Sequence, residues 1–470
     1  MPTRDITPLV IGGSYRHRSK DQINRRAVNV WPHLQDNQFG KSAYIAENFP
    51  GLKAFSSDAS GTHRGTFDHN GVLYHLVDTT LYSVSSAGVH TSLGTIAGSS
   101  RATFDSAGSS ILLAVDGVAY EWDGSTLTTG TDGDFETPDT VTVLNSQAIY
   151  DGDDSRFGVS DVGDYLNINA LNYGTADAEG DFLQRPYAFE ENVFMFGDRT
   201  IEQWWNVGEG NPPFTRIQGA TREVGIGAKH SIGENDQFVY FLGHDSRIYR
   251  MQGNSDPLPI SQHSLEREIQ EYSTVSDAIG WCFTWEGQNF YTICFPTADK
   301  THIFPEQGEW FELSSGADGG RWCADGYANV FGKHLISCTD GTILELDAET
   351  YTENGSTIIR TLDSAPVHAG LFGSPGKSLD WGEVIITLQT GVALETGQGS
   401  APRLIFTYSD DGGRTFATEQ WIDMGLIGRY QLEAKISGLC GANSRILRFR
   451  LSDPVPLTLM SVSADLEMGL

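Results

Sequence analysis

A short string of residues occurs twice in the first quarter of the chain, and this repeat constrains the fold more than any other feature. Residues 64–68 read Arg-Gly-Thr-Phe-Asp and residues 101–105 read Arg-Ala-Thr-Phe-Asp. Each copy is followed by a glycine turn, an apolar run, an aspartate turn and a second apolar run. Self-similarity of this kind is typical of folds built from repeated supersecondary units. We therefore predict an array of small β-sheets.

The aspartate turn can be followed further along the chain. An aspartate shortly before a strand residue recurs at Asp78, Asp116, Asp198, Asp245 and Asp340, with weaker copies at Asp161 and Asp299. The successive spacings of 38, 45, 37, 47, 54 and 41 residues match one four-stranded propeller blade. A hairpin reversal needs a positive φ or a side chain that bonds its own backbone, so these aspartates are predicted to be structural. Residues 61–357 are predicted to form one propeller of six or seven blades, with the five stronger aspartates at equivalent turns.

The rest of the chain is also predicted to be almost entirely β. Short runs of alternating polarity end at Gly, Asp, Asn or Ser throughout, and the one predicted helix covers residues 264–272, with Ser264 as its cap. Beyond Ile358 the repeat stops, and longer strands are predicted at residues 381–388, 403–408, 432–436 and 446–451. Residues 358–470 are therefore expected to form a β-sandwich-like domain, and residues 1–60, which lack the repeat, an extended N-terminal arm.

Charge and cysteine content exclude several classes of protein. The chain has 31 Lys and Arg against 61 Asp and Glu, a net charge of −30, which is the opposite of the basic surface of a nucleic-acid-binding protein. No apolar stretch is long enough for a membrane helix and the first residues lack a signal-peptide core, so synthesis in the cytoplasm without membrane insertion is expected. The odd number of five cysteines, without a C-x-x-C pair, predicts buried free thiols.

The N-terminal segment has the opposite charge from the rest of the chain. Residues 1–41 contain seven Lys and Arg against three Asp, a net charge of +4, which leaves −34 on the remainder. A basic segment on an acidic body indicates a docking element for a partner. The candidate docking residues are Arg16, Arg18, Lys20, Arg25 and Arg26. The alternative is that the segment pairs with the chain's own acidic propeller.

No motif in the sequence predicts catalysis, a cofactor or a metal. Residues 409–416 fit the Asp-box pattern of sialidase propellers, with Asp411 as the turn-capping residue, but the box occurs once and outside the repeat region. The acidic loops at residues 132–134 and 151–154 have oxygen ligands suited to calcium, yet neither completes an EF-hand, so solvated turns are the preferred interpretation. Phosphate-binding, zinc-protease and esterase motifs do not occur.

Several short segments resemble the packaged-DNA stabilisation proteins of short-tailed double-stranded DNA bacteriophages. In the N-terminal part they are Val-Asn-Val-Trp-Pro at residues 28–32, Phe-Pro-Gly at 49–51 and Arg-Gly at 64–65. In the middle they are Ile-Tyr at residues 248–249 and Pro-Ile-Ser at 259–261, followed by the predicted helix. Towards the C-terminus they are residues 408–412 and 448–460. The resemblance therefore spans nearly the whole chain.

The resemblance implies a structural virion protein, the tail nozzle, also called the tail accessory or hub protein. Proteins of this kind form a hexameric ring below the portal–adaptor complex, extend the DNA channel, retain packaged DNA and support tail spikes, fibres or a needle. It further implies that DNA passes without sequence-specific binding, that no catalytic residue is carried over, and that the protein resides in the virion tail. Two alternatives remain open from the residues alone: a glycan-binding tail spike or fibre, and a sialidase-like glycosidase propeller.

Overall fold

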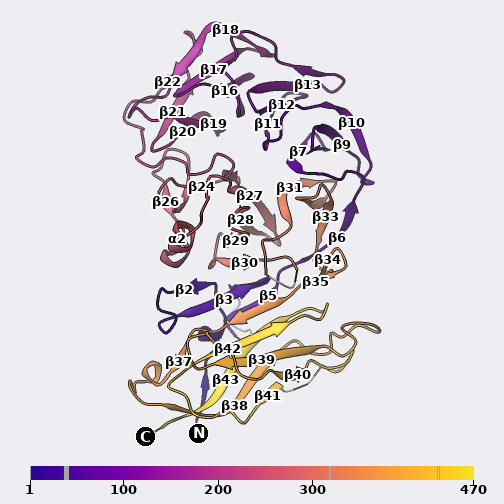
Figure 1. Cartoon of the computed structure of the whole chain (residues 1–470), viewed down its shortest axis with the longest axis vertical. Helices are drawn as coiled ribbons and strands as arrows, with labels where there is room; N and C mark the ends of the chain where they lie inside the picture. The colour runs from indigo at the N-terminus through magenta and orange to yellow at the C-terminus, as the bar shows by residue number, and fades with distance from the viewer. Residues whose placement is uncertain (1, 36–41, 317–318, 431, 433, 470) are drawn as a thin grey trace.

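The protein consists of a ring of small sheets joined to a pair of longer-stranded sheets. The computed structural model describes residues 2–35, 42–316, 319–430, 432 and 434–469. Figure 1 shows the ring in the upper part of the view and the paired sheets, together with both chain ends, in the lower part. The chain is all-β, with short helices only at α1 (Thr7–Val10), α2 (His263–Gln270) and the 3-10 helix η1 (Ala369–Phe372) among the described residues.

The ring is a β-propeller of seven four-stranded antiparallel blades. Blades one to three are β7 (His63–His69), β8 (Val72–Val77), β9 (Thr80–Val84) and β10 (His90–Thr95); β11 (Thr103–Ala107), β12 (Ser110–Val115), β13 (Val118–Trp122) and β14 (Leu127–Thr129); and β15 (Val141–Leu144), β16 (Gln147–Asp151), β17 (Arg156–Asp161) and β18 (Asp164–Thr175). Blades four and five are β19 (Leu183–Phe189), β20 (Asn192–Gly197), β21 (Ile201–Asn206) and β22 (Phe214–Arg216); and β23 (Gly233–Glu234), β24 (Val239–Leu242), β25 (Ile248–Met251) and β26 (Leu258–Pro259). Blade six is β27 (Ile279–Trp285), β28 (Gln288–Phe295), β29 (Lys300–Pro305) and β30 (Phe311–Leu313).

Blade seven closes the ring with a strand taken from before blade one. Its first three strands are β31 (Ala324–Val330), β32 (Lys333–Cys338) and β33 (Ile343–Asp347), and its outermost strand is β6 (Gly51–Ser56), which pairs antiparallel with β33. The short strands β34 (Thr352–Glu353) and β35 (Ser356–Thr357) extend this sheet beyond β6. Residues 51–56 are therefore part of the propeller. A strand from before the first blade that completes the last blade ties the two ends of the propeller together by backbone hydrogen bonds.

The paired sheets form a β-sandwich that contains strands from both ends of the chain. One sheet has the order β4 (Val30–Leu34), β5 (Tyr44–Asn48), β43 (Thr458–Met468), β38 (Leu379–Leu388) and β41 (Ala434–Ile436), with β1 (Thr3–Asp5) on β43. The other has β3 (Asn24–Val28), β36 (Arg360–Asp363), β42 (Ser444–Leu451), β39 (Arg403–Ser409) and β40 (Gln420–Asp423), with β2 (Tyr15–Arg16) on β3 and β37 (Val367–His368) on β42.

These pairings correct the prediction of an extended N-terminal arm. The first 60 residues lack the repeat because most of their strands belong to the sandwich. Their alternating strands pair with strands more than 300 residues away, for example Arg26 with Asp363, and such distant partners leave no signal in the local sequence.

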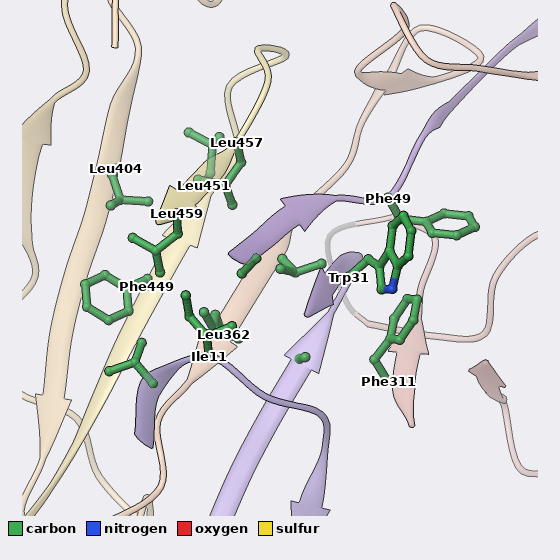
Figure 2. Close-up of a cluster of buried hydrophobic side chains, with 14 of the residues drawn as sticks. Ile11, Trp31, Phe49, Phe311, Leu362, Leu404, Phe449, Leu451, Leu457 and Leu459 are labelled. Carbon is green, nitrogen blue, oxygen red and sulfur yellow. The ribbon is translucent and has the colours of Figure 1, made fainter. Parts of the chain in front are cut away.

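The two domains share one sheet and one core. β30 of blade six pairs in parallel with β3, with Val28 opposite Glu312, so blade six and one sandwich sheet form a continuous sheet. Figure 2 shows the adjoining core, in which Trp31 of β4 and Phe49 lie beside Phe311 of β30, and leucines such as Leu404 and Leu459 fill the interior of the sandwich. The ring centroids of Phe49 and Phe311 are 6.0 Å apart. Burial of this apolar surface makes the junction a packed interface.

The predicted helix is present with a shifted start. α2 begins at His263, so its cap position is Gln262, which makes no side-chain cap bond, and Ser264 is buried inside the helix. Leu265 and Ile269 pack into a core with blades five and six, as their spacing on one face requires. The short helix α1, with Pro8 in its first turn, was not predicted.

Candidate functional site

Three of the five candidate docking residues bind the chain's own sixth blade. Arg16 and Arg26 each bind one carboxylate oxygen of Glu312. Arg16 Nη2 lies 2.9 Å from Oε1, and Arg26 Nη2 lies 2.8 Å from Oε2. Arg25 forms an ion pair with Glu309 and donates from Nε to the Gly13 carbonyl at 2.8 Å. The alternative interpretation of the basic segment, pairing within the chain, therefore holds for these three arginines.

Glu312 is a buried carboxylate that joins the two domains. Its residue is 4% exposed. Burial alone would raise its pKa, but the two guanidinium groups of Arg16 and Arg26 outweigh burial and lower the pKa of Glu312 to about 2. The carboxylate is therefore ionised at neutral pH, and its two charge-assisted contacts tie the N-terminal segment to the propeller.

The other two candidate docking residues face solvent. Arg18 and Lys20 are exposed in the turn between β2 and β3. The neighbouring Asp21 accepts a hydrogen bond at 2.6 Å from Arg414 of the sandwich, so the turn lies against the Asp-box loop. Of the charged residues counted in the segment, Asp36 and Lys41 lie outside the described residues.

The structure places the five strong repeat aspartates at one kind of turn. Asp78, Asp116, Asp198, Asp245 and Asp340 all lie between the second and third strands of their blades. The weaker copy Asp299 occupies the same turn of blade six, with a φ of 54°. Asp161 does not, because it is the last residue of β17, before the turn between the third and fourth strands of blade three, and the equivalent turn there holds Asp154, with a φ of 60°. Asp78 and Asp116 also have a positive φ, at 48° and 49°, whereas in blades five and seven the next residues, Ser246 and Gly341, adopt it. Asp198 is not among the residues with a positive φ.

Two of these aspartates also hold the connection between blades. The Asp116 carboxylate accepts the amides of Ser99 and Ser100 at 2.8 and 3.0 Å, and Asp78 accepts the amide of Thr62 at 2.8 Å. These amides precede the first strands of blades two and one. The aspartates therefore set both the local turn and the position of the incoming chain.

A buried charged cluster joins three blades close to the propeller axis. Asp325 of β31 lies 3.2 Å from His63 Nδ1 of β7, and its carboxylate also contacts Arg101 at 3.4 Å and Arg321 at 3.2 Å. Burial would raise the pKa of Asp325, but His63 and the two arginines hold it well below its usual range. No sequence pattern predicts this cluster, because its residues come from three separate blades and share no motif.

The single Asp box is a turn in the sandwich. Asp411, between β39 and β40, accepts the backbone amides of Arg414 and Thr415 at 2.8 and 2.9 Å. Hydrogen bonds from Thr415 are the largest influence, and they hold the pKa of Asp411 well below its usual range. The acidic loops behave similarly, since Asp132 accepts the amide of Asp134 and Asp151 accepts that of Thr140. Asp411 and Asp132 therefore cap turns of the backbone, whereas Asp151 holds the chain that enters β15.

Three further observations concern ligands and membranes. Among the described residues, no group of three His, Cys, Asp or Glu side chains is placed to hold a metal ion. A cleft of about 700 Å³ lies between the domains, with Trp31 and Tyr44 on the sandwich side and Glu286 and Glu309 on blade six. In the part of the chain that the structure describes, no helix is long and apolar enough to cross a membrane.

The chain is therefore a two-domain protein in which a β-propeller and a β-sandwich are tied together by a shared sheet, a shared core and buried ion pairs. Two family models match the chain: "Bacteriophage P22 Gp10, beta-propeller" over residues 6–351 and "Bacteriophage P22 Gp10, beta-sandwich" over residues 379–467. The chain belongs to the P22 Gp10 family, the tail nozzle and DNA-stabilisation proteins of short-tailed bacteriophages. It is a structural component of the virion tail and not an enzyme.

The other comparisons are more distant. The comparison with curated proteins gave no match. Among solved structures, the computationally designed Ika8 protein is 12% identical, with a TM-score of 0.39 over 72% of this chain and 99% of that chain. BamB from Moraxella catarrhalis is 12% identical, with a TM-score of 0.40 over 73% of this chain and 97% of that chain.

Proposed function

We propose that six copies of this chain form a ring below the portal–adaptor complex, where the ring extends the DNA channel, retains the packaged genome and releases it at ejection. The family supports the position in the tail. To this position we add a homohexamer, contacts with the adaptor, contacts with spike, fibre or needle proteins, and the passage of DNA without sequence-specific binding. The observation that carries it is the uneven distribution of charge between the two domains.

Almost all the negative charge lies on the propeller. Residues 1–41 have a net charge of +4, and residues 358–470, with nine Lys and Arg against twelve Asp and Glu, have −3. The segment 42–357, which contains the propeller, therefore has a net charge of −31, and the rest of the chain has a net charge of +1. Copies of the propeller repel one another, whereas the nearly neutral sandwich does not, so self-association is favoured through the sandwich.

The sandwich also has an apolar surface suited to a second copy. β40 and β41 end their respective sheets, and exposed apolar side chains gather on β40 and the two loops beside it. We call this surface the sandwich flank; it comprises Leu394, Trp421, Leu426, Ile427 and Tyr430, which are 40–71% exposed. Open sheet edges with exposed apolar side chains favour association with another chain. A neighbouring copy that covers this flank gives a head-to-tail contact, which closes into a ring.

The acidic propeller supports a mechanical role towards DNA. A duplex is held electrostatically by Lys and Arg that displace counterions from phosphates, and the propeller segment has a large excess of acids. Retention of DNA is then steric, and DNA slides past the wall when the obstruction opens. Arg18 and Lys20, which face solvent, remain the proposed contact with an acidic partner in the tail.

Particle mass tests the ring directly. The purified protein is expected to have six times the 51.4 kDa chain mass by mass photometry, whereas three copies would favour a trimeric spike or fibre. The double variant Trp421→Asp/Ile427→Asp is expected to be monomeric with an unchanged melting temperature. The control Leu258→Asp, an exposed apolar position on the outer strand of blade five, is expected to keep the ring. A ring that survives both changes at the flank would place the contact elsewhere.

DNA retention needs a separate measurement. Particles that lack this protein are expected to lose packaged DNA, and the purified ring is expected to bind duplex DNA weakly at low and moderate salt. Stable, DNA-filled particles without the protein would contradict the retention role. Tight binding of duplex DNA that weakens steeply with salt would contradict the proposal that DNA slides along the channel without being bound.

A further inference from the structure

Two cysteine thiols of the closing blade are in contact. Cys338 at the end of β32 and Cys323, the residue before β31, have their Sγ atoms 3.1 Å apart, compared with about 2.05 Å in a disulfide. The backbones are hydrogen-bonded neighbours at this point, since Ala324 is opposite Cys338 and the Thr339 amide donates to the Cys323 carbonyl at 3.3 Å. The paired strands therefore hold the two sulfurs next to each other.

The surroundings restrict the reactivity of the pair. Cys338 is 3% exposed and Cys323 is half-buried. The contact with Cys338, followed by burial, raises the pKa of Cys323 well above its usual value. Because the thiolate is the reactive form, the pair is expected to react slowly, and the reducing cytoplasm in which the chain is made keeps both thiols reduced.

We propose that Cys323 and Cys338 form a disulfide when the protein leaves the host cytoplasm and meets dioxygen. The two S–H bonds break and one S–S bond forms. The two electrons and two protons that are released reduce one dioxygen molecule to hydrogen peroxide. This site is independent of the ring and of any role in DNA retention.

The bond would strengthen the hairpin of β31 and β32 in the blade that closes the propeller. It would link the beginning of β31 to the end of β32, next to β33, which pairs with the closing strand β6. A crosslink that closes a loop removes conformations from the unfolded chain and so stabilises the folded state. The remaining thiols offer a natural comparison, because Cys282 and Cys294 lie in blade six and Cys440 is exposed in the sandwich.

Alkylation under denaturing conditions tests the proposal on the whole protein. After purification under reductant, five thiols are expected to be alkylated. After prolonged exposure to air, only three thiols are expected to be alkylated. The oxidised chain is also expected to be lighter by two hydrogens and to give a crosslinked peptide that contains Cys323 and Cys338. The melting temperature is expected to rise by several degrees on oxidation. Five alkylated thiols after exposure, or crosslinks that involve only Cys440, would overturn the proposal.

Matched variants separate the bond from general effects of oxidation. Cys440→Ser is expected to keep both the crosslink and the shift in melting temperature. Cys323→Ser and Cys338→Ser are each expected to lose both. If a serine at the buried position prevents folding, the peptide map of the oxidised wild-type chain still decides whether the bond forms.

Discussion

Arg26 of the N-terminal segment and Glu312 of the sixth blade form an ion pair, with Nη2 and Oε2 2.8 Å apart, across the boundary between the sandwich and the propeller. The same carboxylate also binds Arg16. Residues nearly 300 positions apart therefore share one buried charge network, and the basic segment serves mainly to join the domains.

This network predicts a defined pH dependence of stability. The pKa of Glu312 is about 2 in the folded protein and about 4.3 in an unfolded chain. A lowered pKa means that the contribution is complete above the unfolded value and is lost as the pH falls from about 4.3 towards 2. We expect Glu312→Gln to lower the free energy of unfolding by about 3 kcal/mol at pH 7 and to flatten its pH dependence in this window.

Denaturant titrations between pH 2 and 7 measure this effect. The control is Glu309→Gln, because the Glu309 side chain is 47% exposed and exposed ion pairs contribute little. Equal losses for the two variants would show that burial of the Glu312 network is not the cause.

Closure by β6 predicts a second sensitive position. Leu52 is 1% exposed and pairs with Leu346 across the closing strands. We expect Leu52→Ala to cost about 2–5 kcal/mol of unfolding free energy, through the lost burial and the cavity left behind. The matched change Ala54→Ser, at an exposed position of the same strand, is expected to have little effect. Limited proteolysis between β6 and β7 provides a second measurement, since a loosened β6 exposes this connection. Unchanged cleavage in a destabilised Leu52→Ala variant would argue against closure by this strand.

Aspartates that hold the chain entering a blade are expected to contribute more to stability than aspartates that cap only their own turn. Asp116 caps two amides of the chain that enters blade two and has a φ of 49°. We expect Asp116→Ala to cost about 1–2 kcal/mol, and Asp116→Asn to cost less because asparagine tolerates this φ. Asp123 caps only its own outer turn, so Asp123→Ala is expected to have the smaller effect. Thermal unfolding monitored by circular dichroism compares the three variants, and equal melting temperatures would contradict a role in blade connection.

The exposed basic pair predicts an effect on assembly without an effect on folding. We expect Arg18→Glu/Lys20→Glu to reduce the amount of this protein in particles several-fold while its melting temperature stays the same, because both side chains face solvent. Arg16→Ala and Arg26→Ala are each expected to lower the melting temperature instead, since each removes one of the two arginine partners of the buried Glu312. Quantitative mass spectrometry of purified particles measures incorporation. Normal incorporation of the double variant would remove Arg18 and Lys20 as docking residues.

The repeated hairpins could be predicted from the amino-acid sequence, because turn chemistry and alternating polarity are local. The spacing of the aspartates from Asp78 to Asp340 was sufficient to predict a propeller. The change in strand pattern beyond Ile358 was sufficient to predict a second β-domain. Local signals also explain the error at Asp161, since two turns of blade three contain an aspartate and only backbone pairing distinguishes them. The apolar face of α2 could be recognised in the sequence, whereas the cap position, Gln262, could not.

The positions of the two ends of the chain could not be predicted from the sequence and are seen only in the folded protein. β6 closes blade seven, β3 to β5 complete the sandwich, and Arg16, Arg25 and Arg26 bind acids of blade six, because each of these contacts joins residues far apart in sequence. The cluster around Asp325 is of the same kind, with members from three blades. Pairing across hundreds of residues depends on which edges and charges remain unsatisfied once the repeats have folded, and no local pattern carries that information.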